Sequence, residues 1–347
     1  MSTGSASASW PLSSRYALMV SALALSHELR GVDGVRLWAK APLAPFTTIG
    51  TGGKANLLVT VGSTPALVAT LGLLEASGSP WLCLGAGSNL LVADTGYPGA
   101  VVKLDESFHY VEGMPTEPFA EPRRVVVSVG AGTYLARLAA VAAETGLAGL
   151  EFACGIPGSI GGGVAMNAGA HGWSLVDVVQ EVEVATAAGV HWLPASSLEW
   201  GYRWCRLPAE SVVTAVRIGL TAGDRTSILE RHRSLLRQRR VTQPRGGRSF
   251  GSVFKNPPGD AAGRRLEAAG LKGVRRGGAE VSNIHANFIV NLGDATTTDV
   301  LALMSLMRQG VQRTSRILLE PEVRLLGTAF PWESPVDSSQ GSPGTHG

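Results

Sequence analysis

The alternation of hydrophobic and polar positions over residues 55–104 predicts strands around one helix. The apolar run Ala55–Thr60 predicts a strand, and Thr64-Pro65 predicts the start of a helix that ends near Gly78. Further strands are expected at 81–84, 90–93 and 101–104, and a glycine-rich loop begins at Gly85. This order indicates an α/β unit with a glycine-rich crossing loop.

The pattern continues as α+β through residue 221. Strands are expected at 125–129, 182–186 and 212–219, and a helix is expected over 133–145 with Gly146 as its stop. Residues 155–172 hold the densest run of glycines and are expected to form a loop.

The last part of the pattern predicts a third unit. A basic helix is followed by a loop around Ser252, a short helix from Asp260 to Gly270 and a strand at 287–291. A long helix then begins with the capping-box pair Thr296 and Asp299.

Composition fits a globular enzyme with a large core, because 45% of residues are hydrophobic and 16% are charged. Eight arginines lie between residues 225 and 248, either as a solvated helix face or as a phosphate-binding surface. Aromatic residues are almost absent there, which argues against nucleic-acid binding. The three cysteines and seven histidines follow no metal-ligand spacing, so we expect no metal site, and we expect reduced thiols in the cytoplasm.

The two ends are expected to be disordered, at about residues 1–12 and 331–347, with the ordered part running from Leu37 to Gly327. The apolar stretch Ala17–Leu25 has a weak positive start, so a surface helix or a disordered lead is favoured over a signal peptide. No run of 18 apolar residues occurs, so no membrane span is expected.

Two glycine-rich loops are candidate phosphate cradles, because glycine lets backbone N–H groups approach a phosphate closely. Gly85-Ala-Gly-Ser-Asn89 follows a strand, but Leu90 stands where a Rossmann fingerprint needs glycine. Gly155–Gly163 is flanked by apolar residues, which indicates a buried backbone whose N–H groups need partners. Together the loops favour a dinucleotide such as FAD, and close backbone packing is the alternative.

The segment Gly251–Pro257 gathers a hydroxyl (Ser252), a cation (Lys255) and an amide (Asn256) within a loop. Such a group suits a site that holds an anion and delivers a proton, although a polar turn would also explain it.

The chain resembles a known family, the UDP-N-acetylenolpyruvoylglucosamine reductases. The resemblance covers residues 42–327 and rests on ten segments in the family's order, none decisive alone. These segments are Thr47–Gly53, Leu84–Leu91, Gly149–Gly158, Asn167–Ala170, Tyr202-Arg203, Thr242–Pro244, Gly251–Pro257, Ala269–Gly273, His285–Phe288 and Leu319–Val323.

The resemblance implies an α+β protein: a two-subdomain FAD-binding fold of the vanillyl-alcohol oxidase type, plus a C-terminal α+β substrate-binding domain. The implied ranges are a lead at 1–40, an FAD-binding domain at 41–222 with subdomains 41–104 and 105–222, a substrate domain at 223–328 and a tail at 329–347. NADPH would reduce non-covalently bound FAD. Hydride would then pass to C3 of the enolpyruvyl group and a proton to C2, giving UDP-N-acetylmuramate for peptidoglycan synthesis.

The resemblance also implies the roles of individual residues. Ser252 is the expected proton donor, Arg203 would stabilise the enolate-like charge, and Glu322 would act protonated or as a hydrogen-bond partner of the substrate carboxylate. The residues expected to hold the substrate are Tyr202, Arg240, Lys255, Asn256 and His285. The residues expected to hold FAD are Gly53, Gly85, Ala86, Gly87, Ser88, Asn89, Leu90, Gly155, Ile156, Pro157, Gly158, Gly161, Gly162, Asn167, Gly169 and Ala170.

Some positions depart from the family pattern. Cys205 stands where a serine is usual, which weakens the expected support of Arg203, and Cys154 replaces a smaller residue near the expected flavin. The short span from Arg203 to Ser252 indicates the subtype without the extra substrate-clamping loop. A monomer is favoured. The alternatives are another flavin oxidoreductase of the same fold and a non-catalytic protein that binds flavin or a UDP-sugar.

Overall fold

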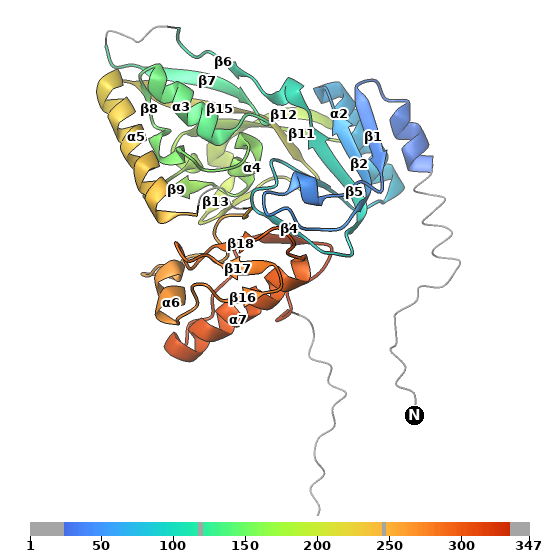
Figure 1. The fold of residues 1–347 in the computed structure, drawn as a ribbon. Helices are drawn as coiled ribbons and strands as arrows, with labels where there is room; N and C mark the ends of the chain where they lie inside the picture. Colours follow the sequence, from blue (N-terminus) through green and yellow to red (C-terminus); the bar gives the residue numbers. More distant parts are fainter. Residues whose placement is uncertain (1–23, 117–120, 245–247, 334–347) are drawn as a thin grey trace, which may run out of the picture. The chain divides into compact units, whose positions relative to one another are not determined.

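The computed structural model describes residues 24–116, 121–244 and 248–333, and the chain divides into two compact units (Figure 1). Unit 1 holds the described residues up to 41 together with 55–87 and 98–239. Unit 2 holds 42–54, 88–97 and the described residues from 240 onward. Both units are therefore built from separated segments, whereas the sequence predicted contiguous domains. The predicted ranges of the FAD-binding domain (41–222) and the substrate-binding domain (223–328) stay a prediction.

The first sheet of unit 1 has the strand order β1-β2-β5-β3, with β3 parallel to β5 and β1 antiparallel to β2. The helix α2 (Thr64–Ser77) packs on this region through Leu67, Leu71 and Leu74. Its N-cap is Ser63, one residue before the predicted start, and it ends at Gly78 in the left-handed conformation, as expected. The strands are β1 (Val35–Ala39), β2 (Ala55–Val61), β3 (Trp81–Cys83) and β5 (Tyr97–Leu104).

The ordered chain begins earlier than Leu37, so that prediction was wrong. Residues 24–30 are helical, and Leu25 and Leu29 are buried in the core formed by β2, β5 and α2. Two leucines four residues apart lie on one face of a helix, which explains how so short a segment is held. The strand β1 was also missed. The predicted disorder at 1–12 lies outside the described residues.

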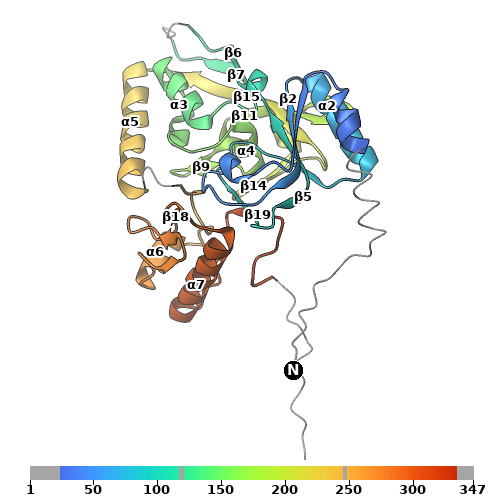
Figure 2. The same ribbon diagram turned by 45° about the vertical axis from the view of Figure 1, so that its right-hand side comes forward.

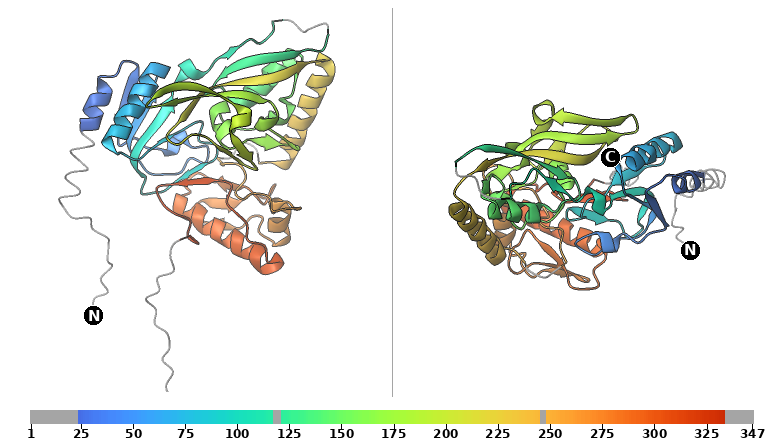
Figure 3. Two further views of the ribbon diagram at one scale, coloured as in Figure 1. Left: turned by 180° about the vertical axis from the view of Figure 1, so that it is seen from behind. Right: turned by 90° about the horizontal axis from the view of Figure 1, so that it is seen from above.

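The second sheet of unit 1 is antiparallel, in the order β12-β11-β15-β7-β6, with β8 also pairing β15; it can be followed from behind in Figure 3. One face packs on α3 (Leu135–Glu144) and α4 (Ile160–Ala165) through a core of valines, leucines and alanines. The strands are β6 (Val111–Glu112), β7 (Arg124–Gly130), β8 (Leu147–Ala148), β11 (Val179–Thr186), β12 (Gly189–Pro194) and β15 (Val212–Ala222).

Two small hairpins and one long helix complete unit 1. The hairpins are β9 (Gly169–Ala170) with β10 (Trp173–Ser174), and β13 (Glu199–Gly201) with β14 (Trp204–Arg206). The basic helix α5 (Arg225–Thr242) buries Ile228 and His232 and leaves most of its arginines exposed. Of the helices in the described part of the chain, none combines the length and apolarity needed to cross a membrane.

Unit 2 contains a short antiparallel sheet, β16-β17-β18, and a parallel pair, β4 with β19. The helices α6 (Ala262–Ala268) and α7 (Thr297–Ser315) lie side by side, as Figure 2 shows, and α7 packs on β16 and β17. A separate core with Phe250, Phe254 and Met307 joins these elements. The strands are β4 (Leu90–Val92), β16 (Arg275–Arg276), β17 (Ala279–Val281), β18 (Ile289–Asn291) and β19 (Arg324–Leu326).

The start of α7 is capped twice. The predicted capping box between Thr296 and Asp299 is present. In addition, the Asp94 carboxylate accepts hydrogen bonds from the backbone N–H groups of Thr297 and Thr298, at 2.8 and 2.9 Å. Carboxylates at a helix N-terminus satisfy its free donors and its dipole, so Asp94 ties the β4 segment to α7.

The C-terminal tail begins later than predicted. Phe330 is buried, its ring stacks on Trp332 with centroids 5.0 Å apart, and the Arg308 guanidinium lies 5.0 Å from the Trp332 ring. These contacts extend the packed chain past residue 329, where the tail was expected to start. The rest of the predicted tail, from residue 334, lies outside the described residues.

Candidate active site

The second glycine-rich loop of unit 1 is bound along its length to the segment after β7. Leu135 N–H donates to Gly158 O at 2.9 Å, Ile160 N–H to Thr133 O at 2.8 Å, and Gly161 N–H to Ala131 O at 3.0 Å. Gly155 and Gly158 adopt φ of +68° and +120°, which side chains disfavour. The loop is therefore fixed by backbone hydrogen bonds.

Part of this stretch is helical, which corrects the expectation of a loop throughout. The helix α4 contains Gly161, Gly162 and Gly163. A Cβ at Gly161 would lie 2.9 Å from the Ala131 Cβ, and one at Gly163 would lie 2.9 Å from Leu175 Cδ1. Close packing explains these two glycines. A Cβ at Gly162 would find its nearest atom, Ser159 Oγ, at 3.5 Å, so packing does not require that glycine.

The first glycine-rich loop reaches the second one within unit 1. A Cβ at Gly85 would lie 2.8 Å from Ser159 Oγ, so a side chain at this position would require the Ser159 hydroxyl to move. The Lys103 ammonium donates to Gly85 O at 3.4 Å, and burial lowers the pKa of Lys103 below its ordinary value. Gly87, which follows, has φ +65°. Adjacent glycine loops backed by a cation form a cradle that suits the phosphates of a dinucleotide such as FAD.

Arginine and cysteine side chains border the second loop. A Cβ at Gly155 would lie 3.1 Å from Arg239 Cδ, which places this residue of α5 against the loop. Burial lowers the pKa of Arg239, and the positive charge of Arg203 acts in the same direction. Burial raises the pKa of the Cys154 thiol, opposed by Arg239, so the thiol stays protonated. Arg239 was missed by the sequence analysis, which selected its neighbour Arg240.

The turn between β13 and β14 carries Tyr202 and Arg203. Arg203 adopts φ +67°, an unfavourable conformation for a residue with a side chain, and its guanidinium carbon lies 4.9 Å from the Tyr202 ring centre. Asn167 links this hairpin to the segment at Val176. Its Nδ2 donates to Gly201 O at 3.0 Å, and its Oδ1 accepts from Val176 N–H at 3.1 Å. Burial raises the pKa of Cys205 in β14 to about 11.

The Ser252 segment of unit 2 is held from two sides. Ser252 pairs with Phe288, and Val253 N–H donates to Asn287 O at 2.9 Å. On the other side, Glu322 N–H donates to Val253 O at 2.9 Å, and Lys255 N–H donates to Glu320 O at 2.9 Å. The structure therefore brings together the backbones of Ser252 and Glu322, two residues that the sequence analysis selected 70 positions apart.

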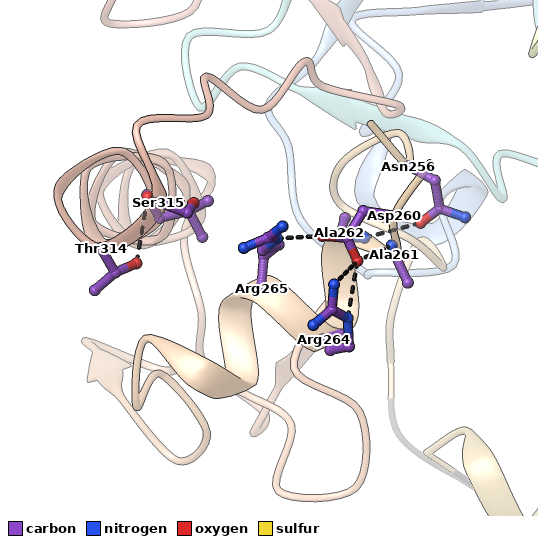
Figure 4. Close-up of polar contacts among 9 residues, drawn as sticks. Asn256, Asp260, Ala261, Ala262, Arg264, Arg265, Thr314 and Ser315 are labelled. Atoms are coloured by element: carbon purple, nitrogen blue, oxygen red, sulfur yellow. Dashed lines mark hydrogen bonds and ion pairs between the residues drawn. The ribbon is translucent and has the colours of Figure 1, made fainter. Parts of the chain in front are cut away.

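Lys255 and Asn256 continue from this segment. The Lys255 ammonium lies 3.4 Å from the exposed Glu320 carboxylate. The Asn256 Oδ1 accepts from Ala262 N–H at 3.0 Å at the start of α6, as Figure 4 shows, where Asp260 also contacts Arg264 and Arg265. The predicted substrate residue Asn256 thus also fixes the start of a helix.

His285 is largely enclosed. Its Nδ1 accepts from Asn287 N–H at 3.1 Å, and its ring meets the Phe288 ring edge-on at 4.9 Å. Burial and then Lys272 lower the pKa of His285, with Glu267 opposing. Its Nδ1 thus supports the Ser252 segment through Asn287, a residue that the sequence analysis did not select.

Three further predicted FAD residues, in addition to Gly161, also have structural roles. A Cβ at Gly53 would lie 2.3 Å from Asp94 O, and one at Gly169 would lie 2.4 Å from Trp173 O, so both glycines allow two backbone segments to approach. Asn89 uses its side-chain Nδ2 to donate to Glu322 O at 3.1 Å. Close backbone packing, the alternative left open for the glycines, accounts for Gly53 and Gly169 within the protein.

This chain is similar to known proteins over most of its length. The FAD binding domain family matches residues 55–193, and the UDP-N-acetylenolpyruvoylglucosamine reductase C-terminal domain family matches residues 243–326. A reductase of that name from Anaeromyxobacter sp. (strain Fw109-5) is 48% identical over 83% of this chain and 87% of its own length. The reductase of the same name from Myxococcus xanthus (strain DK1622) is 44% identical over 88% of this chain and 96% of its own length.

A solved structure also matches over most of its length. The UDP-N-acetylenolpyruvylglucosamine reductase from Thermus caldophilus superposes with a TM-score of 0.71 at 38% identity, over 84% of this chain and 98% of that one. These matches confirm the predicted α+β class and an FAD-binding domain followed by a distinct C-terminal domain.

Proposed function

This chain belongs to the UDP-N-acetylenolpyruvoylglucosamine reductase family, and we propose that it reduces the enolpyruvyl group of UDP-N-acetylglucosamine-enolpyruvate with NADPH and FAD. The product is UDP-N-acetylmuramate for peptidoglycan synthesis. The observation that carries the proposal is the hydrogen bond from Glu322 N–H to Val253 O at 2.9 Å, because it joins the backbone of the proposed carboxylate residue to the residue next to the proposed proton donor, Ser252. We also propose that the protein works in the cytoplasm and as a monomer.

The cradle in unit 1 would hold FAD. Gly85, Gly87, Gly155 and Gly158 would present backbone groups to it, and a Cβ at Gly162 would meet Ser159 Oγ only at an ordinary contact distance of 3.5 Å. When bound, FAD accepts hydride from NADPH and supplies hydride to C3 of the substrate. Arg239 would place positive charge beside the loop at Gly155. The other residues predicted for FAD remain part of the proposal.

The chain's own residues would complete the reaction at C2. Addition of hydride at C3 leaves negative charge on C2 and the neighbouring carboxylate, and Arg203 would stabilise that charge with its fixed guanidinium. Ser252 would then donate its hydroxyl proton to C2, primed by Lys255 or through Glu322. Glu322 would contact the substrate carboxylate. Tyr202, Arg240, Lys255, Asn256 and His285 would hold the remaining parts of the substrate.

The proposal is tested by mixing the purified, FAD-loaded protein with NADPH, with and without the UDP-linked enolpyruvyl sugar. We expect rapid loss of NADPH absorbance only when the sugar is present. NADPH oxidation at the same rate with and without the sugar would point to a different flavin oxidoreductase. An absence of both flavin and NADPH oxidation would point to a non-catalytic protein.

A further inference from the structure

Phe254 lies two residues after Ser252, and its main-chain polar groups are buried. The whole Phe254 residue is 0% exposed, so its N–H and C=O have no access to water and need partners in the protein. The segment forms isolated pairs with Phe288 and Pro321 instead of a regular ladder. A side chain must therefore supply the partners that a neighbouring strand would supply in a sheet.

Asn287 supplies both partners. Its Oδ1 accepts from Phe254 N–H at 3.0 Å, and its Nδ2 donates to Phe254 O at 2.8 Å. A side-chain carboxamide carries an acceptor oxygen and a donor NH₂ on the same carbon. It can therefore bond the N–H and C=O of one residue, as the opposite residue of an antiparallel strand pair would. Asn287 is only 2% exposed, which makes each of these bonds costly to break.

The backbone of Asn287 is fixed as well. Its carbonyl accepts from Val253 N–H at 2.9 Å, and its N–H donates to His285 Nδ1 at 3.1 Å. The side chain cannot follow a shift of the Ser252 segment without breaking these bonds. Asn287 thus links His285 rigidly to the residues next to Ser252.

We propose that Asn287 is a positioning residue that sets the place of the Ser252 hydroxyl for proton donation. The inference rests on the proposed function, because it assumes that Ser252 donates the proton. Asn287 touches neither substrate nor cofactor in this account, and it acts only through the backbone of Val253 and Phe254.

The test uses the variant Asn287→Asp in the FAD-loaded protein. The substitution keeps the size of the side chain and the acceptor for Phe254 N–H, but it places a carboxylate oxygen against Phe254 O. Flavin reduction by NADPH should stay within about twofold of the parent, since it needs no proton from Ser252. Reoxidation of the reduced flavin by the enolpyruvyl sugar should slow by roughly tenfold or more.

Asn291→Asp is the matched control. Asn291 is also a buried asparagine of unit 2, and its Nδ2 donates to Ile49 O at 2.9 Å, but its side chain does not bond the Ser252 segment. In the Asn291→Asp variant, the rate at which the sugar reoxidises the reduced flavin should stay within about twofold of the parent. This should hold even if the melting temperature falls as much as in Asn287→Asp. Equal slowing in both variants would assign Asn287 a general stabilising role and overturn the proposal.

A double-mutant cycle with Ser252→Ala separates the inference from the proposed function. If Ser252→Ala itself leaves reoxidation unchanged, the proposed proton donor is wrong. If it slows reoxidation, adding Asn287→Asp should cause less than about a twofold further loss. A full additional tenfold loss would show that Asn287 acts independently of Ser252. Should Asn287→Asp fail to bind FAD, Asn287→Ser with Asn291→Ser as control carries the same comparison without a buried charge.

Discussion

The side-chain Nδ2 of Asn89 donates a hydrogen bond of 3.1 Å to the backbone carbonyl of Glu322. In return, Arg324 N–H donates to Asn89 O at 3.1 Å, just before the parallel strands β4 and β19 begin to pair. The glycine-rich loop predicted to bind FAD therefore ends on a residue that also holds the backbone of Glu322. We infer that the position of Glu322 depends on Asn89.

Asn89→Asp should lower turnover by about tenfold and the free energy of unfolding by about 1 kcal/mol, because the donor to Glu322 O is lost. Steady-state rates at saturating FAD, together with thermal melting, measure both effects. Asn56→Asp is the control, since Asn56 also donates to a backbone carbonyl, Pro98 O, on the exposed surface of unit 1. Full activity in Asn89→Asp would refute the link between Asn89 and Glu322.

Gly161→Ala and Gly162→Ala should have opposite effects on the protein without FAD. The added methyl of Gly161→Ala would crowd Ala131 and cost about 1–3 kcal/mol of stability. Gly162→Ala has room in the protein and should raise the free energy of unfolding by up to about 1 kcal/mol, as alanine favours helix.

In FAD titrations, however, Gly162→Ala should bind the cofactor at least tenfold more weakly, because its methyl would occupy the space proposed for FAD. Unchanged FAD affinity in a stable Gly162→Ala protein would place the cofactor elsewhere.

Arg203→Gly should separate stability from activity. Removing a side chain from a residue at φ +67° relieves backbone strain, so the free energy of unfolding should stay unchanged or rise by up to about 1 kcal/mol. Turnover should fall by roughly 10²-fold or more because the proposed cation is lost. Glu210→Gly, at φ +51° on an exposed turn of unit 1, should match its stability and keep full activity. Similar turnover in the two variants would remove Arg203 from the mechanism.

Stability should fall as the pH drops through the range where His285 titrates. Burial and Lys272 hold the pKa of His285 below its ordinary value of about 6.5. The unfolded chain therefore binds its proton first as the pH falls, so the stabilisation is complete above pH ~6.5 and is lost down to the folded-state pKa. Protonation at Nδ1 would also remove the acceptor for Asn287 N–H.

His285→Asn keeps an acceptor near Nδ1 and does not titrate, so its melting temperature should vary less between pH 7 and 5 than that of the parent. His232 is also buried with a lowered pKa, so it makes the melting temperature depend on pH in the same way in both proteins. Its contribution therefore drops out when the two proteins are compared. An identical change of melting temperature between pH 7 and 5 in the two proteins would contradict the role given to His285.

The sequence predicted most elements of both units, because their periodicity and caps are local. The helix at 64–77 and the capping box at Thr296 lie within one residue of the structure. The glycine-rich helix α4 was missed, since its glycines disfavour helix and are explained only by contacts with Ala131 and Leu175. The helix at 24–30 was missed because two buried leucines gave too short a pattern.

The candidate site was predictable only in part, for the same reason. Ser252 and Glu322 stand out through the family's segments, and the structure brings their backbones together. Arg239 and Asn287 act through tertiary contacts, with Gly155 and with Phe254, that no local pattern encodes. The local sign that could have drawn notice is an asparagine, Asn287, at the start of the predicted apolar strand 287–291.

Reduction of the enolpyruvyl double bond with one hydride and one exchangeable proton can be followed by running the reaction in deuterated water with unlabelled NADPH. Mass spectrometry and proton NMR of the product then locate the label. We predict UDP-N-acetylmuramate with one deuterium at C2, because the proton comes from a solvent-exchanging hydroxyl. The label at C3 does not enter the test, because the hydride passes through a flavin N–H group that also exchanges with solvent. Hydrogen at C2 of the product, or the absence of this product, would contradict the proposed reduction.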